Sequence, residues 1–278
     1  MPSPSTFSTE ETERYARHFL LPQVGQAGQE RLKKSSVLLI GLGGLGSPAA
    51  TYLAAAGVGR LGLVDPDVVD LSNLQRQILY TTPETGKSKT EAAAARLRAL
   101  NPHVKLDVIP QRFTAKNAMK IARPYDVLVD GTDNFPTRYL VNDTAFFLGK
   151  PNAYGAISRF EGQTSFFKPG KETACYRCIF PEPPPPERAP SCADAGVLGV
   201  VPGLIGLIQA TETLKAIMGL GSSLANRLLI YDALAMKFRE MTLRRNPECP
   251  LCGNRPAITR LQHLRGGFNA WKKRDHST

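Results

Sequence analysis

The regular alternation of short apolar runs and helical segments over residues 36–148 most constrains how this chain can fold. The apolar runs lie at residues 36–40, 61–64, 104–109 and 126–130, and the helical patterns lie at 47–56, 88–100, 114–122 and 136–148. Parallel strands joined by helices are covered on both faces and therefore read as continuous apolar runs. The pattern predicts a Rossmann-like, doubly wound α/β fold with a mostly parallel sheet.

The second half of the chain has a different character. Residues 156–168 read as antiparallel strands that turn around Glu161 and Gly162, and a proline-rich loop follows at 180–190. An apolar helix is expected at 203–218, and residues 227–244 resemble a closing hairpin. We therefore expect antiparallel strands in the C-terminal half of the sheet.

Three segments are expected along the chain. Residues 1–35 form a helical segment, in which Thr9 is the expected helix cap. Residues 36–253 form a nucleotide-binding domain, and residues 254–278 form a basic tail.

Composition limits the class of protein and its partners. The chain has 278 residues, 42% of them hydrophobic, and a net charge of +11, which suits an anionic partner such as a nucleotide. About half of that excess lies in residues 254–278, so a nucleic acid is not the expected direct partner. The sequence opens with no secretory signal, and its longest apolar stretch, residues 197–208, is too short to span a bilayer. We expect a cytoplasmic protein with no membrane partner.

The first predicted strand leads into a glycine-rich turn, "GLGGLG". Gly41, Gly43 and Gly46 match the G-x-G-x-x-G pattern, which offers backbone N–H groups and a helix N-terminus to a phosphate. Asp65 ends the second strand, where a carboxylate would bind ribose hydroxyls. On these residues alone, NAD with hydride chemistry is favoured over ATP.

Downstream residues favour a triphosphate over NAD. Segments 70–77 and 86–92 supply Asn73, Arg76, Gln77, Lys87 and Lys89. The three cations of this set, Arg76, Lys87 and Lys89, suit phosphates on which charge builds during transfer, whereas a nicotinamide site has no evident use for them. Asp133 follows the fourth strand, where a carboxylate beside a triphosphate would bind Mg²⁺. The alternative is that Arg76 and Lys89 are surface charges and that Asp133 caps a helix.

Four of the five cysteines form two C-x-x-C pairs. Cys175 and Cys178 are separated from Cys249 and Cys252 by 70 intervening residues, a pattern that predicts a closed, structural Zn²⁺ site. A thioredoxin-like redox pair or two disulfides are the alternatives, and a cytosolic setting disfavours disulfides. Cys192 follows the proline-rich loop and is either a reactive thiol or a spare one.

Several motifs together resemble the MoeB/ThiF family, bacterial relatives of ubiquitin-activating enzymes. They are "GLGGLG", "VGRLGLVDPDVVDLSNLQRQ", "TDNFPTRYLVND", "CYRC" and "RNPECPLCG", and the resemblance runs from about Arg14 to Gly253. Residues 123–143 and 180–197 look most like the TtuC/MoeZ-type sulfur-carrier activators within that family. The resemblance implies an adenylyltransferase that uses ATP to adenylate the C-terminal glycine of a ubiquitin-fold sulfur-carrier protein ending in Gly-Gly. Pyrophosphate is released, and the carrier becomes ready for thiocarboxylate formation in tRNA thiolation or in molybdopterin or thiamine-type sulfur transfer.

The resemblance also implies roles for individual residues. Catalytic roles fall on Arg17, Arg76, Lys89, Asp133 and Cys192. The nucleotide-binding set is Gly41, Gly43, Gly44, Gly46, Asp65, Ser72, Asn73, Arg76, Lys89, Asp133 and Asn134. Asp133 would hold Mg²⁺, and Arg17 would reach into the site of a neighbouring subunit, which implies a homodimer. The loop of Cys192 would cross near the active site, where such a cysteine takes part in thioester, acyl-disulfide or persulfide chemistry.

The tail resembles the linker to a rhodanese domain, followed by the closing segment of one at residues 264–273, without the body between them. A chance basic helix is the alternative. Without that body the sulfur would come from a separate donor, either a cysteine desulfurase or a rhodanese. Three other functions stay open: adenylation of a modified tRNA base by a related branch of the family, an NAD-dependent dehydrogenase, and a non-catalytic zinc scaffold.

Overall fold

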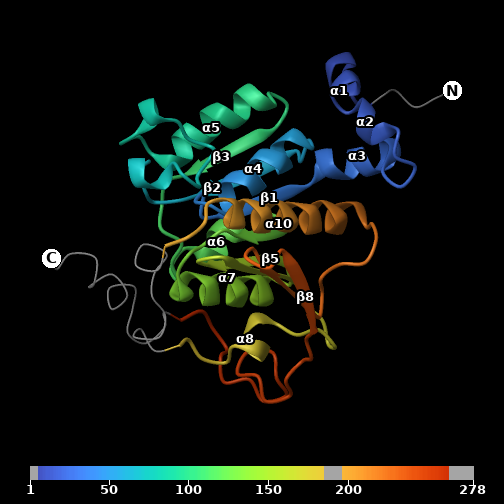
Figure 1. Cartoon of the computed structure of the whole chain (residues 1–278). Coiled ribbons are helices and arrows are strands. Elements are labelled where there is room, and N and C mark those ends of the chain that lie inside the picture. The colour runs from blue at the N-terminus through green and yellow to red at the C-terminus, as the bar shows by residue number, and fades with distance from the viewer. Residues whose placement is uncertain (1–5, 185–195, 263–278) are drawn as a thin grey trace.

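A single eight-stranded sheet organises the chain in the computed structural model, which describes residues 6–184 and 196–262 (Figure 1). The strand order is β3-β2-β1-β4-β5-β6-β7-β8. The strands are β1 (Ser36–Ile40), β2 (Arg60–Val64), β3 (Lys105–Ile109), β4 (Val127–Asp130), β5 (Asn152–Ser158), β6 (Glu161–Phe167), β7 (Arg227–Asp232) and β8 (Lys237–Thr242). Pairings from β3 to β5 are parallel and those from β5 to β8 are antiparallel. The doubly wound, mixed sheet confirms the expected fold class.

Helices cover both faces of the sheet. The helices are α1 (Thr9–Arg14), α2 (Ala16–Phe19), α3 (Gly25–Lys34), α4 (Gly46–Ala55), α5 (Lys89–Leu100), α6 (Ala118–Ala122), α7 (Phe135–Leu148), α8 (Tyr176–Ile179) and α10 (Val200–Met218), with the 3₁₀ turns η1 (Leu71–Asn73) and η2 (Thr82–Glu84). Helices α3, α4, α5 and α10 share one core, and α6 and α7 pack on the opposite face (Figure 1). Helix α8 lies beside α7 at the edge of the molecule (Figure 1).

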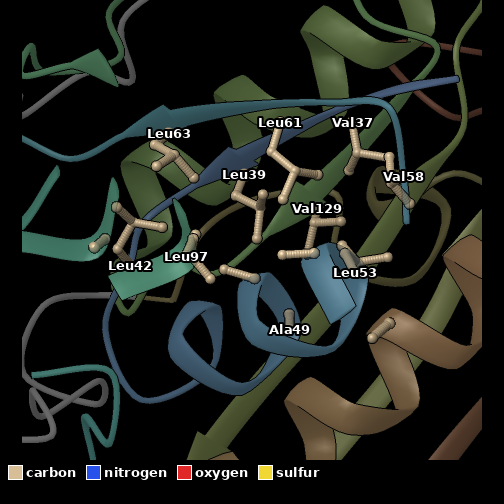
Figure 2. Packing of buried hydrophobic residues seen from close by; sticks show 14 of the residues in the cluster. Val37, Leu39, Leu42, Ala49, Leu53, Val58, Leu61, Leu63, Leu97 and Val129 are labelled. Carbon is tan, nitrogen blue, oxygen red and sulfur yellow. The ribbon is translucent and has the colours of Figure 1, made fainter. Parts of the chain in front are cut away.

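The side chains of the central strands alternate between two cores. Val37 and Leu39 of β1 pack toward Ala49 and Leu53 of α4 (Figure 2), whereas Leu38 packs in the core of α6 and α7. Both faces of β1 are thus buried, and this explains why residues 36–40 read as an unbroken apolar run.

Three local expectations differ from the structure. Ser8, not Thr9, caps α1, because Ser8 and Glu11 form a reciprocal capping box that Thr9 cannot form with Thr12. The β5–β6 turn lies at residues 159–160, where Arg159 has a φ of 53°, and Glu161 begins the next strand. Helix α6 begins only at Ala118, because the Asn117 side chain accepts a hydrogen bond from the Thr114 amide and turns the chain there.

Helix α10 contains most of the apolar stretch at residues 197–208 and continues beyond it. By length and composition alone, this helix could cross a membrane. Its contacts are those of a core helix, since it packs across β4, β5 and β6 and against α3 and α4. Gln209 is fully buried, and its Nε2 donates to the carbonyls of Asp130 and Ala153, 2.8 Å from each. These bonds attach α10 to the middle of the sheet.

Candidate functional site

The glycine turn after β1 leaves no room for a side chain at Gly41 or Gly46. A Cβ on Gly46 would lie 2.0 Å from the Gly41 carbonyl oxygen, and Gly41 itself has a φ of +89°. A Cβ on Gly131, in the loop after β4, would lie 2.5 Å from the same oxygen. The loops that follow β1 and β4 are therefore in backbone contact at the carboxyl edge of the sheet, where α/β proteins bind ligands.

Two further segments cover the turn. A Cβ on Gly44 would lie 3.0 Å from Pro202 of α10 and 3.5 Å from Cγ of Arg76. A Cβ on Gly43 would lie 3.5 Å from Nε2 of Gln77. The structure therefore brings Arg76 and Gln77, predicted from the sequence, against the glycine turn.

Asp65 holds the turn through its carboxylate. Its two oxygens accept hydrogen bonds from the amides of Leu42 (2.8 Å) and Asp67 (2.9 Å), and the residue is only 5% exposed. Burial raises the pKa of Asp65, and the nearby charge of Lys89 opposes that rise. Each carboxylate oxygen keeps a second lone pair with which it can accept a bond from a ribose hydroxyl.

Lys89 is a buried cation rather than a surface charge. It is 5% exposed at the start of α5, and its Nζ lies 3.4 Å from a carboxylate oxygen of Asp67. Asp67 was not predicted from the sequence, although its position two residues after Asp65 could have indicated it. The alternative that Lys89 is a surface charge is therefore wrong.

The segment around η1 orders the other polar side chains. Arg76 is half-buried, and its Nη1 donates to the Ser72 carbonyl at 3.1 Å. Ser72 donates through its amide and hydroxyl to Asp70, and Asn73 accepts from Nε2 of Gln77 at 2.9 Å. This turn places Ser72, Asn73 and Arg76 on one short segment.

Asp133 and Asn134 follow β4. Asn134, not Asp133, caps α7, since its Oδ1 accepts from the Thr137 amide at 2.9 Å. The Asp133 carboxylate is exposed at the edge of the sheet. The alternative that Asp133 is a helix cap is therefore wrong, and its carboxylate is accessible to a cation.

Two predicted residues are not joined to this site. Arg17 is exposed on α2, which packs on α3 (Figure 1), and among the described residues its side chain forms no hydrogen bond or ion pair with another predicted site residue. Cys192 lies outside the described residues, as do residues 263–278, which include the predicted rhodanese-like segment.

The two C-x-x-C pairs converge on one cluster. The Sγ atoms of Cys175, Cys178, Cys249 and Cys252 all lie within 4.8 Å of one another, and neighbouring pairs are 3.3–3.9 Å apart. Tetrahedral zinc with Zn–S bonds of about 2.3 Å requires S···S separations of about 3.8 Å. None of these four cysteines forms a disulfide. The cluster fits zinc, and its four thiols leave no ligand position open.

Sequence reasoning missed a set of buried polar groups behind the loop after β4. Asp130 is fully buried and Arg138 is 7% exposed, and neither residue was assigned a role from the sequence. Among the described residues, Oδ2 of Asp130, Nε of Arg138 and the Tyr154 hydroxyl have no hydrogen-bond partner. The available signal for Arg138 was its place inside the motif "TDNFPTRYLVND", one of those on which the family resemblance rests.

Comparisons with known proteins agree on one family. The sequence model of the ThiF family matches residues 15–251. The sulfur carrier protein adenylyltransferase of Thermus thermophilus is 54% identical over 259 residues, which cover 92% of this chain and 96% of the relative. The adenylyltransferase and sulfurtransferase MOCS3 of Sus scrofa is 49% identical, and the match covers 96% of this chain but 58% of the relative.

The fold likewise has solved counterparts. The crystal structure of E. coli MccB with MccA-N7isoASN aligns with a TM-score of 0.77 over 91% of this chain and 77% of that one. At 23% identity this likeness shows the fold alone.

Proposed function

The chain belongs to the ThiF family, and from that membership we propose that it adenylates the C-terminal carboxylate of a ubiquitin-fold sulfur-carrier protein. The relative from Thermus thermophilus, named for this reaction, matches over nearly its whole length. The observation that carries the proposal is the meeting of two loops at the glycine turn, with the cations Arg76 and Lys89 near one loop and Asp133 on the other.

The reaction needs positioning more than proton transfer. A C-terminal carboxyl has a pKa near 3.5, so it is ionised at neutral pH and needs no general base. A carboxylate oxygen attacks the α-phosphorus of ATP, the bond to the bridging oxygen breaks, and pyrophosphate leaves with that electron pair. The enzyme has to bring two anions together and offset their repulsion.

The residues at the carboxyl edge fit this task. Asp65 binds the ribose, Gly41, Gly43, Gly44 and Gly46 let the backbone approach the phosphates, and Ser72, Asn73, Arg76 and Lys89 bind the phosphates. Asp133, beside Asn134, binds Mg²⁺, since its carboxylate is exposed and free of the capping role. The ion supplies charge neutralisation for the phosphates when bound.

The complete enzyme is a homodimer in this proposal. Arg17 is exposed on α2 and is bonded to no other predicted site residue among those described, and in this proposal it reaches the site of a second subunit. The adenylating domain comprises residues 36–253, between the helical segment 1–35 and the basic tail 254–278.

Sulfur enters from a separate donor, a cysteine desulfurase or a rhodanese, and Cys192 takes part in the step that follows adenylation. The relatives with sulfurtransferase in their names are longer than this chain, which spans 58% of MOCS3. We place the reaction in the cytoplasm.

ATP–pyrophosphate exchange tests the proposal. Purified protein is assayed with Mg²⁺ and with small Gly-Gly-ended proteins added one at a time, each paired with a version lacking its last glycine. Exchange that appears only with an intact carrier supports the proposal and identifies the partner. Absence of exchange with every carrier, in a zinc-loaded sample that still binds ATP, contradicts it.

A further inference from the structure

A continuous set of buried side chains joins the thiol cluster to the loop that carries Asp133. The first knuckle, residues 175–178, contains Tyr176 and Arg177 between its two cysteines, and they are 1% and 6% exposed. Both side chains point away from solvent and contact residues of α7. The knuckle is therefore packed into the same helix that begins beside Asp133.

Arg177 attaches the knuckle to the second half of α7. Its Nε and Nη2 each lie 2.8 Å from an oxygen of the buried Asp143. The Tyr176 amide donates to Oδ1 of Asn142 at 3.0 Å. These bonds fix where the knuckle sits along the helix.

Tyr176 reaches from the knuckle toward the start of α7. Its ring lies 4.9 Å from that of Tyr139 and 5.2 Å from that of Tyr154, centroid to centroid. The Tyr154 ring connects Tyr176 to Arg138, because it contacts both side chains. The Arg138 guanidinium lies 5.5 Å from the centroid of the Tyr154 ring.

Arg138 in turn holds the peptide before Asp133. Its Nη2 donates to the Thr132 carbonyl at 3.3 Å, and that carbonyl belongs to the peptide that joins Thr132 to Asp133. The amide and hydroxyl of Thr132 donate to Oδ1 of Asp130, at 3.0 and 2.6 Å. The peptide is thus fixed from both sides, and the direction in which Asp133 leaves the loop is fixed with it.

Stability alone does not explain this arrangement. A buried arginine and a buried aspartate that each leave a polar atom unpaired are costly to fold, and apolar side chains of similar size would avoid that cost. In return, Asp130 and Arg138 hold the loop in a fixed orientation through their bonds to Thr132.

We propose that Tyr176 and Arg138 are positioning residues that couple the zinc knuckle to Asp133 and so set the Mg²⁺ dependence of adenylation. This inference rests on the proposed function, in which Asp133 holds Mg²⁺. Neither residue touches the nucleotide; both act by fixing the peptide that precedes Asp133.

Two matched tyrosine variants test the coupling. Tyr176→Leu removes the ring that contacts Tyr154 and, through it, Arg138. Tyr139→Leu removes a ring of the same cluster that contacts Tyr176 and Arg177 instead. Both tyrosines are 1% exposed, so the two substitutions are made at equally buried positions. We expect Tyr176→Leu to raise the Mg²⁺ concentration for half-maximal exchange about fivefold with little change in kcat, and Arg138→Lys to raise it about tenfold. Tyr139→Leu leaves it unchanged.

A readout independent of activity accompanies the assay. Mn²⁺ affinity of each variant, measured by electron paramagnetic resonance with a non-hydrolysable ATP analogue, should fall by the same factors while zinc content stays at one per chain. Equal Mn²⁺ affinity in Tyr176→Leu and Tyr139→Leu, both folded, would overturn the coupling.

Asp133→Asn separates this inference from the proposed function. If Asp133→Asn weakens Mn²⁺ binding while Arg138→Lys does not, the coupling alone is wrong. If Asp133→Asn leaves Mn²⁺ binding intact, the magnesium role of Asp133 is wrong and the coupling falls with it.

Discussion

The Gly41 carbonyl oxygen lies 2.0 Å from the point where a Cβ on Gly46 would stand. Real Cβ atoms do not approach a backbone oxygen so closely, and neither atom belongs to a flexible side chain that could move aside. The turn between β1 and α4 therefore depends on glycine at position 46 for packing. Phosphate binding is a second use of the same close backbone approach.

Gly46→Ala is expected to destabilise the protein by about 3 kcal/mol or more, because the added methyl group overpacks a site bounded by backbone. Gly203→Ala is the matched control, since a Cβ at this position of α10 meets nothing within 4 Å. That change should stabilise the helix by about 0.5–1 kcal/mol, as alanine loses less entropy than glycine. Urea unfolding of both variants measures the difference, and equal stabilities would contradict the packing argument.

The strands and the thiol cluster could be predicted from the sequence because their signals are local. The run at residues 36–40 is apolar because both faces of β1 are buried. The two C-x-x-C pairs contain all four residues of the thiol cluster, so their spacing alone identifies the ligands. The helix cap was placed one residue late because Ser8 and Thr9 are both good caps and only the reciprocal bond with Glu11 decides between them.

The surroundings of the site residues could not be predicted, because they depend on contacts between distant segments. Asp65 was expected to bind ribose, and its bond to the Leu42 amide depends on the register of β1 and β2. From the sequence, Arg138 looks like an ordinary helical arginine. Its contacts with the Thr132 carbonyl after β4 and with the Tyr154 ring of β5 are made only in the folded chain. The roles assigned to Arg76, Asp133 and Cys192 stay predictions.

The pKa of Asp65 gives the folding free energy a pH dependence of known sign. Burial raises this pKa above the usual 3.8, so the folded state binds the proton more tightly than the unfolded state. The contribution of Asp65 to stability therefore falls as pH rises from about 3.8 to the folded-state pKa, and then levels. Asp65→Asn removes this titration, so the variant should gain stability relative to wild type as pH rises through that window.

Asp70 provides a control of opposite sign. The Ser72 side chain lowers the pKa of this exposed carboxyl, so its contribution is present above about 3.8 and lost as pH falls below it. Asp70→Asn should therefore lose stability relative to wild type as pH rises from the folded-state pKa of Asp70 to about 3.8, a range that lies below the one for Asp65. Unfolding in urea at a series of pH values measures both variants, and parallel pH profiles would refute the assigned directions.

Zinc removal is expected to loosen the knuckles and the residues packed on them. Cys249 is fully buried in the cluster, and Leu251 beside it is 1% exposed. Cys249→Ser should reduce zinc to well below one per chain and lower the Tm by about 10 °C, since loss of several kcal/mol shifts a domain of this size by that amount. Cys192→Ser should keep both zinc and Tm. Full zinc in Cys249→Ser would rule out the four-thiolate site.

The ion pair between Arg177 and Asp143 should be among the costliest polar contacts to break. Their side chains are 7% and 3% exposed, and the guanidinium meets the carboxylate through two bonds of 2.8 Å. Asp143→Asn leaves a buried guanidinium without its counter-charge, so the expected loss is about 3–5 kcal/mol.

Glu240→Gln is the matched control for that loss. Glu240 pairs with Arg227 at 3.0 Å, but the two side chains are 45% and 33% exposed, so water screens the charges and replaces the bond. The expected cost is below about 1 kcal/mol. Because both variants exchange a carboxylate for an amide of similar shape, their difference in unfolding free energy isolates burial as the cause. A loss of the same size in both variants would mean that Arg177 finds another partner when Asp143 is neutral, and that the knuckle is held to α7 by its aromatic contacts instead.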